Sequence, residues 1–180
     1  MAANPADVAR LERLIRTIPD FPKPGIQFRD ITPLLGSPSA FQVALAAMVS
    51  DVPEGVDMVA GVESRGFIFG TPMAMALGCG FVPIRKPGKL PAAVFEEAFE
   101  LEYGTSTLAM HVDALKPGQK VLLIDDLLAS GGTLVAAANL VRAAQAEVIH
   151  VSVLIELADL GGREQLAANG LDHLSSVVVY

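Results

Sequence analysis

Four short apolar runs, separated by segments of helical pattern, constrain the fold of this chain more than any other feature. The runs are Met58–Val62, Phe81–Arg85, Val121–Asp126 and Val148–Ile155, and the helical patterns between them include Phe67–Leu77 and Thr133–Gln145. Because strand–helix alternation builds parallel sheets covered by helices, we expect an α/β fold with a parallel-type central sheet flanked by helices. Ligands bind such sheets beyond the carboxyl ends of the strands, so functional residues should follow these runs.

The N-terminal part of the chain has a different pattern. Asn4 followed by Pro5 is a favourable helix start. The apolar residues that continue this helix at helical spacing are Val8, Leu11, Ile15 and Ile18. Prolines exclude a helix from residues 19–33, and a second helix is expected over Ser39–Asp51. Without an internal repeat or a break in composition, we expect residues 1–180 to form a single domain.

Charge and composition exclude several classes of protein. The 180 residues carry 13 basic and 20 acidic side chains, a net charge of −7, so a nucleic acid is not an expected partner. No apolar run approaches the roughly 18 residues that a membrane-spanning helix needs, and the N-terminus does not resemble a signal peptide. Cys79 is the single cysteine, which excludes intrachain disulfides and fits a reducing cytoplasm. We therefore expect a soluble cytoplasmic protein.

The segment VLLIDDLLASGGT, residues 121–133, is the strongest motif in the chain. Asp125 and Asp126 follow an apolar run, at a point where we expect the chain to reach solvent. The small residues of the following loop are Ala129, Ser130, Gly131 and Gly132. Such a loop lets backbone N–H groups approach a phosphate, and the helix start at Thr133 adds further N–H groups and a positive dipole.

The paired carboxylates need a different role, because they would repel a phosphate. They could bind the hydroxyls of the same ligand or a metal ion, and a sugar phosphate meets both requirements. The alternative is structural: two adjacent acids at a strand end can be a helix cap and a solvated neighbour.

This segment closely resembles the 5-phosphoribosyl-1-pyrophosphate (PRPP) signature of the type I phosphoribosyltransferases. Further segments are similar to the adenine phosphoribosyltransferase family and occur in its order. They are FPKPGIQFRDITPLL (21–35), ESRGF (63–67), PIRKPGKLP (83–91) and EYGT (102–105). The resemblance implies the type I phosphoribosyltransferase fold with a small N-terminal and hood region. It also implies the reaction of adenine with PRPP to give AMP and pyrophosphate, Mg²⁺ held mainly by the substrate, and a homodimer.

The resemblance also implies roles for individual residues. Asp125 and Asp126 would hold the ribose hydroxyls, and the 5′-phosphate would lie against Ala129, Ser130, Gly131, Gly132 and Thr133. Pyrophosphate would be bound by Arg65, Arg85, Lys86 and Lys89, partly across the dimer interface, with Arg65 also catalytic. Glu102 would handle a proton at the purine imidazole edge. Tyr103, in a hood loop at about 87–105, would shield the reacting centre. Adenine would meet Gln27, Phe28 and Arg29 in the base-recognition segment, about 21–35.

Structural alternatives stay open for several of these residues. Arg65 could be a surface arginine paired with Glu63, and the cations of 85–89 could belong to a solvated loop. Glu102 could be a solvated glutamate before a turn, and Phe28 could be a core residue. The family's pyrophosphate loop commonly carries a non-proline cis peptide, for which Glu63–Ser64 is the candidate here.

Other functions are also possible on this sequence. The base could be xanthine, hypoxanthine or orotate, or the chain could be a regulator that senses PRPP without catalysis. A nucleotide-dependent phosphotransferase is disfavoured because Phe67 stands where a Walker A loop over Gly61–Gly66 requires lysine. A nucleophile-elbow hydrolase is disfavoured because Val62, not glycine, precedes Ser64 by two residues.

Overall fold

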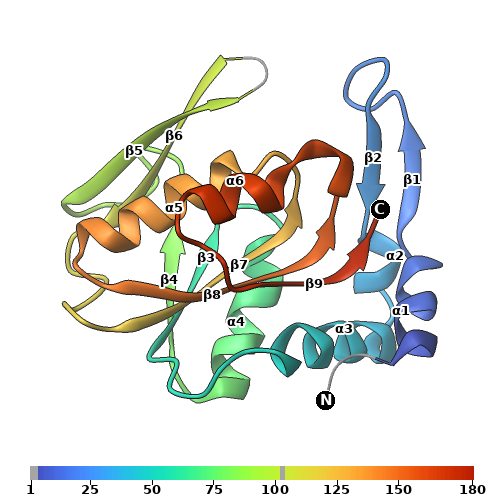
Figure 1. Ribbon diagram of the computed structural model, residues 1–180, viewed down its shortest axis with the longest axis horizontal. Coiled ribbons are helices and arrows are strands. Elements are labelled where there is room, and N and C mark those ends of the chain that lie inside the picture. Colours follow the sequence, from blue (N-terminus) through green and yellow to red (C-terminus); the bar gives the residue numbers. More distant parts are fainter. Residues whose placement is uncertain (1–3, 102–103) are drawn as a thin grey trace. The chain divides into compact units, whose positions relative to one another are not determined.

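The four apolar runs form neighbouring strands of one parallel sheet in the computed structural model, which describes residues 4–101 and 104–180 (Figure 1). These strands are β3 (Met58–Val62), β4 (Gly80–Ile84), β7 (Lys120–Leu128) and β8 (Glu147–Glu156), and β9 (Leu174–Val179) is a fifth that we did not expect. The order is β4-β3-β7-β8-β9, and every neighbouring pair is parallel. The expected α/β class is confirmed.

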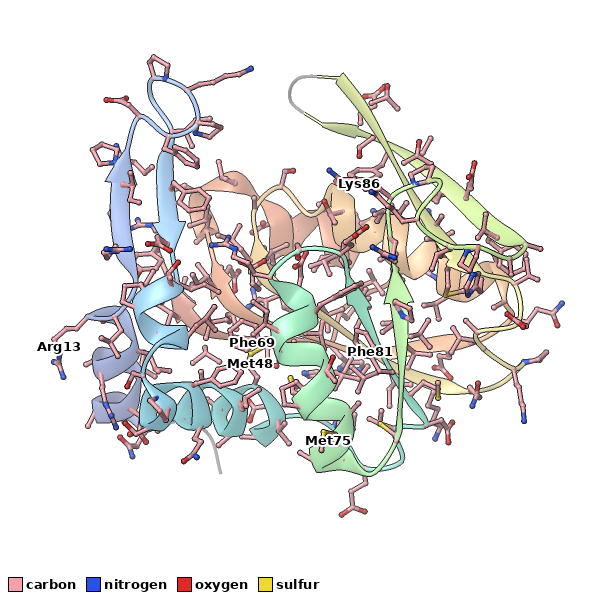
Figure 2. All side chains as sticks on the ribbon, turned by 180° about the vertical axis from the view of Figure 1, so that it is seen from behind. Arg13, Met48, Phe69, Met75, Phe81 and Lys86 are labelled. Atoms are coloured by element: carbon pink, nitrogen blue, oxygen red, sulfur yellow. The ribbon has the colours of Figure 1, made fainter. Side chains whose placement is uncertain are left out.

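Helices cover both faces of this sheet. α4 (Gly66–Leu77) follows β3, α5 (Gly132–Ala143) follows β7, and η1 (Ala158–Leu160) and α6 (Gly162–Ala168) follow β8. Figures 1 and 2, which view opposite sides, show α5 and α6 on one face and α4 on the other. The two helices expected after the first and third runs are therefore confirmed, within one or two residues at each end.

The strand order reverses between β3 and β7. From β3 the chain passes through α4 to β4 on one side, whereas from β7 it passes through α5 to β8 on the other side. In open α/β sheets the crevice beyond the carboxyl ends of the strands at such a reversal is where ligands bind. The sequence thus brings the segments after β3 and β7 together, although they are about sixty residues apart.

The segment expected to form a hood loop is largely a β-hairpin. β5 (Val94–Leu101) and β6 (Gly104–His111) pair antiparallel, and Arg85 joins them through two backbone hydrogen bonds with Ala109. The expectation of a loop was wrong because Phe95 and Phe99, which pack against the core, alternate with the exposed Glu96 and Glu100. Period-two alternation of this kind is the pattern of a half-buried strand.

Residues Met1–Asp51 form a compact unit separate from Val52–Tyr180. The elements of this N-terminal unit are α1 (Pro5–Glu12), an antiparallel pair of β1 (Arg16–Pro19) and β2 (Gln27–Asp30), α2 (Thr32–Leu35) and α3 (Pro38–Ser50). Asn4 caps α1 by accepting the Asp7 N–H, as the sequence indicated, and α3 matches the expected second helix.

Two expectations for the N-terminal unit need correction. α1 ends at Glu12, so Ile15 and Ile18 lie outside the helix; Ile18 belongs to β1, whose pairing with β2 overrides helical spacing from Arg16 onward. The short α2 enters the proline-rich stretch at Thr32, where Pro33 in the first turn lacks an N–H that the helix does not use. In the part of the chain that the structure describes, no helix is long and apolar enough to cross a membrane.

Candidate functional site

Asp125 and Asp126 lie inside β7 and are buried, with 6% and 4% of their surface exposed. The expectation that the chain reaches solvent here was wrong, because pairing with β8 continues to Leu128. Asp125 Oδ1 accepts hydrogen bonds from Ser64 Oγ at 2.7 Å and from the Asp126 N–H at 2.8 Å. Asp126 Oδ2 lies 2.6 Å from Arg65 Nη2. The ends of β3 and β7 are thus joined by two side-chain contacts.

The electrostatics of the acid pair favour a ligand that donates protons or carries positive charge. Burial raises the pKa of the Asp125 carboxyl, and the neighbouring charge of Asp126 raises it further. Burial also raises the pKa of Asp126, against the opposing effect of the Arg65 guanidinium. Two carboxylates held this close in a dry site resist full ionisation, so hydroxyl groups or a cation bound beside them would be stabilising.

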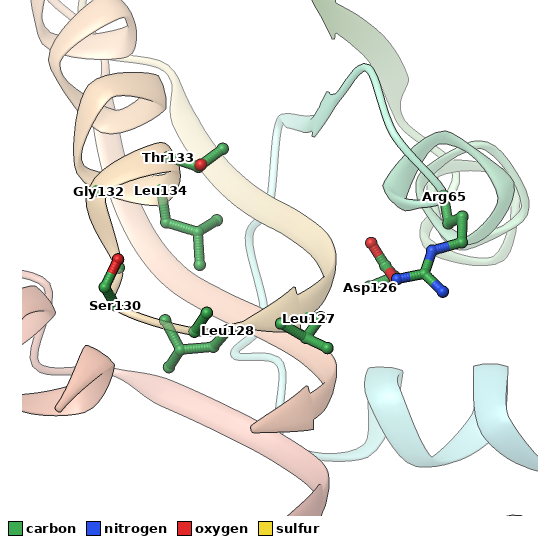
Figure 3. Close-up of a pocket in the computed structure, with 10 residues that line it drawn as sticks. Arg65, Asp126, Leu127, Leu128, Ser130, Gly132, Thr133 and Leu134 are labelled. Atoms are coloured by element: carbon green, nitrogen blue, oxygen red, sulfur yellow. The ribbon is translucent and has the colours of Figure 1, made fainter. Parts of the chain in front are cut away.

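A cavity of about 240 Å³ opens between the ion pair of Arg65 with Asp126 and the loop that follows β7 (Figure 3). Its lining includes Ala129, Ser130, Gly131, Gly132 and Thr133, which we call the phosphate loop. Gly131 has φ +90°, a left-handed conformation that favours glycine. α5 begins at Gly132 without a side-chain cap, so no capping side chain accepts from its first N–H groups. These groups lie at the end of the helix that borders the cavity. Uncapped N–H groups at a helix start are a binding site for a phosphate.

The turn after β3 places Arg65 at this cavity. Ser64 Oγ accepts the Gly66 N–H at 2.9 Å while donating to Asp125, so the serine fixes the turn against β7. Arg65 pairs with Asp126 rather than with Glu63, and the surface-pair alternative was wrong. The sequence points to Ser64 only as part of a candidate cis peptide and as an unsuitable nucleophile; its contact with Asp125 depends on the strand order, which no local pattern reveals.

The expected cis peptide at Glu63–Ser64 is not present: among the described residues, the cis bond is Phe21–Pro22. In the trans form, the Glu63 N–H donates to the Ile84 carbonyl and the Ser64 N–H donates to the Val62 carbonyl, both at 2.7 Å. Both backbone donors are therefore satisfied without the cost of about 3–4 kcal/mol for a non-proline cis bond.

The three cations of 85–89 follow β4, beside the turn that carries Arg65. Arg85 Nη2 donates to Glu63 Oε1 at 2.5 Å and its Nη1 donates to the Lys89 carbonyl at 2.8 Å. Glu63 also accepts the Lys86 N–H, and these contacts hold the pKa of its carboxyl below the ordinary value. Lys86 lies just beyond the carboxyl end of β4 (Figure 2). Arg65 lines the cavity, but these three cations are not among the described residues that do so.

The residues expected to bind adenine lie in the N-terminal unit, on β2. Arg29 Nη1 donates to the hydroxyl of Thr17 on β1. Phe28 is half-buried and packs edge-to-face against Phe21, with ring centroids 5.0 Å apart, and half of the Phe21 surface is exposed. Gln27 is exposed. Glu102 and Tyr103, expected in the hood, lie outside the described residues.

Comparison with known proteins decides the family. Residues 42–170 match the model of the phosphoribosyl transferase domain. The chain is 52% identical over 165 residues to the adenine phosphoribosyltransferase of Cutibacterium acnes, covering 92% of this chain and 93% of the relative. The chain belongs to the adenine phosphoribosyltransferase family. The family member from Aeromonas salmonicida is 50% identical, with 97% of both chains covered.

Solved structures of adenine phosphoribosyltransferases share the fold. The Rhodothermus marinus enzyme superposes with a TM-score of 0.92 at 46% identity, covering 98% of this chain and 100% of that structure. The Giardia lamblia enzyme, solved in complex with 9-deazaadenine, gives a TM-score of 0.88 at 41% identity, covering 100% and 98%. The type I phosphoribosyltransferase fold expected from the sequence is therefore confirmed.

Proposed function

We propose that this protein transfers the 5-phosphoribosyl group from PRPP to adenine, giving AMP and pyrophosphate in purine salvage. The observation that carries the proposal is one cavity lined by the buried Asp126 and by the uncapped phosphate loop, with Asp125 buried next to Asp126 in β7. Its support from outside the site is the identity of about 50% to adenine phosphoribosyltransferases over nearly the whole chain.

The substrate's ribose phosphate fits the two halves of the cavity. The N–H groups of the phosphate loop would bind the 5′-phosphate, with the dipole of α5 behind them. The ribose 2′ and 3′ hydroxyls would donate to Asp125 and Asp126. This assignment uses both carboxylates as hydrogen-bond acceptors, and hydrogen bonds are what buried carboxylates need in order to stay charged.

Departure of pyrophosphate is the step that needs the most charge stabilisation. As the bond to the anomeric carbon breaks, negative charge grows on the leaving group and positive charge on the ribose. Arg65 reaches the cavity from the turn after β3, and in this proposal its guanidinium exchanges Asp126 for pyrophosphate oxygens. Lys86 and Lys89 would add charge from the loop after β4. Arg85, held by Glu63 and the Lys89 carbonyl, would shape that loop as well as contribute charge.

The acid pair also fits the Mg²⁺ that the resemblance implies. Among the residues described, no group of three or more His, Cys, Asp or Glu side chains could form a protein metal cage. Asp125 and Asp126 provide two neighbouring carboxylates whose mutual repulsion a cation would relieve, and Mg²⁺ keeps most of its ligands as water and substrate oxygens. When bound with PRPP, the ion would neutralise charge on the pyrophosphate.

Adenine must lose the proton of its imidazole nitrogen as that nitrogen bonds to the ribose. We assign the proton to the Glu102 carboxylate, with Tyr103 shielding the centre from water, and base recognition to Gln27, Phe28 and Arg29. An extended backbone at Gln27 can both donate to N1 and accept from the 6-amino group of adenine. A base with a carbonyl at C6 would leave one of these groups unpaired.

We further propose a homodimer in the cytoplasm. α4 carries no charged residue and exposes Ile68 and Met75, by 42% and 79%, and a helix that is apolar all round is usually covered by a partner. Sedimentation equilibrium tests the dimer directly, since a monomer at micromolar concentration would contradict it. The single cysteine is in keeping with a reducing compartment.

A parallel assay of bases with PRPP and Mg²⁺ tests the proposed function. Adenine, hypoxanthine, xanthine, guanine and orotate are each supplied at equal concentration, and release of pyrophosphate is measured. We expect turnover with adenine and little with the others. Turnover of another base instead of adenine would favour a different transferase, and PRPP binding without any turnover would favour a sensor.

A further inference from the structure

The backbone of α6 packs directly against the phosphate loop. Gly162 lies so close that an added Cβ would stand 2.0 Å from the Ala129 carbonyl oxygen. From the other side, a Cβ on Gly131 would stand 3.0 Å from the Gly162 carbonyl oxygen. Two backbones approach this closely only where glycines remove the side chains, so the position of α6 determines where the phosphate loop can lie.

α6 depends on contacts with the rest of the fold to hold that position, among them the burial of Leu166 in the core. It has seven residues, well below the roughly 12–15 at which an isolated helix becomes even marginally stable. No side chain caps its N-terminus, which begins at Gly162 after the left-handed Gly161. The start of α6 is therefore intrinsically weak at the point where it touches the phosphate loop.

One such contact is an ion pair between the buried Glu156 carboxylate and the half-exposed Arg163 guanidinium. Arg163 Nε donates to Glu156 Oε1 at 2.9 Å and Nη2 donates to Oε2 at 2.6 Å, a two-point contact that fixes the guanidinium plane. The Glu156 side chain is 6% exposed, and Ser176 Oγ donates to it at 2.6 Å. Arg163 follows Gly162 directly in the chain. The ion pair therefore restrains the residue next to the one that contacts the phosphate loop.

The glutamate end of this pair is rigid. Glu156 is the last residue of β8, and its carbonyl accepts the Tyr180 N–H at 2.9 Å. The neighbouring Leu157 N–H donates to the Leu128 carbonyl at 2.9 Å, which ties the end of β8 to the end of β7. The hydrogen bonds from Arg163 hold the pKa of Glu156 below its ordinary value, so the pair is charged at neutral pH.

We propose that the Glu156–Arg163 pair positions the phosphate loop for the 5′-phosphate, by holding the Gly162 backbone against Ala129 and Gly131. Neither side chain belongs to the described residues that line the cavity, so both act through the loop and are positioning residues. The inference rests on the proposed function, because it takes the loop to be the 5′-phosphate site. It adds two residues outside every motif identified in the sequence.

Binding of AMP and of adenosine, measured by titration calorimetry, separates this role from a general structural one. The two ligands differ only in the 5′-phosphate. We expect Arg163→Gln to weaken AMP binding by about tenfold, the scale of a small misplacement of binding groups, and to leave adenosine binding unchanged. Arg163→Lys, which keeps the charge but not the two-point contact, should fall between. The matched control is Arg142→Gln, which removes a hydrogen bond to the Asn169 carbonyl at the far end of α6 and should bind AMP as the wild type does.

Each outcome separates the two claims. Unchanged AMP affinity in Arg163→Gln, or an equal loss for AMP and adenosine, would overturn the positioning role. Wild-type protein that binds AMP no more tightly than adenosine would instead contradict the phosphate site itself. If Arg163→Gln does not fold, Ser176→Ala removes one hydrogen bond from Glu156 and should weaken AMP binding selectively by a smaller factor; an unchanged AMP affinity there would overturn the inference.

Discussion

Replacement of Gly66 by alanine should damage the site without removing any functional group. Gly66 begins α4, and a Cβ there would stand 2.8 Å from Asp125 Oδ1 and 3.1 Å from Asp125 Cα. Ordinary van der Waals contact begins at 3.4 Å, so the methyl group would be about 0.6 Å too close to the carboxylate. Because Cα belongs to the paired backbone of β7, the side chain of Asp125 must move.

The size of the effect follows from these contacts. Overpacking of a well-filled site costs about 1–3 kcal/mol, and a glycine-to-alanine change in a helix returns at most about 1 kcal/mol. We therefore expect a net loss of about 1–2 kcal/mol, or a fall of a few degrees in the unfolding midpoint. Displacement of Asp125 by about half an ångström should lower kcat/KM for PRPP by about 10–100-fold.

Gly70→Ala is the matched control, because it overpacks the same helix away from the acids. A Cβ on Gly70 would stand 2.6 Å from the Phe81 ring. Thermal unfolding and steady-state kinetics with varied PRPP are measured for both variants. Both should lose stability, whereas only Gly66→Ala should lose kcat/KM for PRPP. Wild-type kinetics in Gly66→Ala, or an equal kinetic loss in Gly70→Ala, would refute the reasoning.

Three further predictions concern charge. Asp125→Asn should raise the unfolding midpoint without substrate, more at pH 8 than at pH 5, and abolish turnover; the raised pKa means that ionisation of this buried carboxyl costs stability as pH rises above 3.8. A midpoint below that of the wild type at pH 8 would contradict this. Asp30→Asn should do the opposite: hydrogen bonds from Thr32 and Arg16 lower the pKa of Asp30 to about 2, so its contribution is present above pH 3.8 and is lost as pH falls toward 2. An acid titration followed by circular dichroism checks it, and a stability difference that persists unchanged at pH 2 would count against it. Lys86→Ala and Lys89→Ala should weaken pyrophosphate binding several-fold by calorimetry, and wild-type affinity in both variants would remove these lysines from the site.

The parts of the site that could be predicted are those encoded by neighbouring residues. β7, the phosphate loop and α5 are continuous in sequence, so the apolar run, the small residues and the helical spacing each mark one element. The same local logic placed β3, α4 and β4 within a residue or two. Burial of Asp125 and Asp126 was missed because it depends on pairing with β8, not on their neighbours in the chain.

What escaped prediction depends on contacts between distant segments. The hydrogen bond from Ser64 to Asp125 spans 61 positions and exists only because β3 lies beside β7. The ion pair between Glu156 and Arg163 joins residues whose separation in sequence fits no motif. The glutamates of β5 suggested an exposed loop, although the aromatic side chains of this strand pack against the core. Helical spacing failed at Ile18 for the same reason, since β1 is determined by its partner strand.

A crystal structure with bound AMP tests the central claim most directly, because AMP carries both groups that the cavity is proposed to bind. We expect the 5′-phosphate to accept hydrogen bonds from the backbone N–H groups of Ala129–Thr133 and the ribose hydroxyls to donate to Asp125 and Asp126. A phosphate found against the cations of 85–89, with Asp126 still paired with Arg65, would contradict the account.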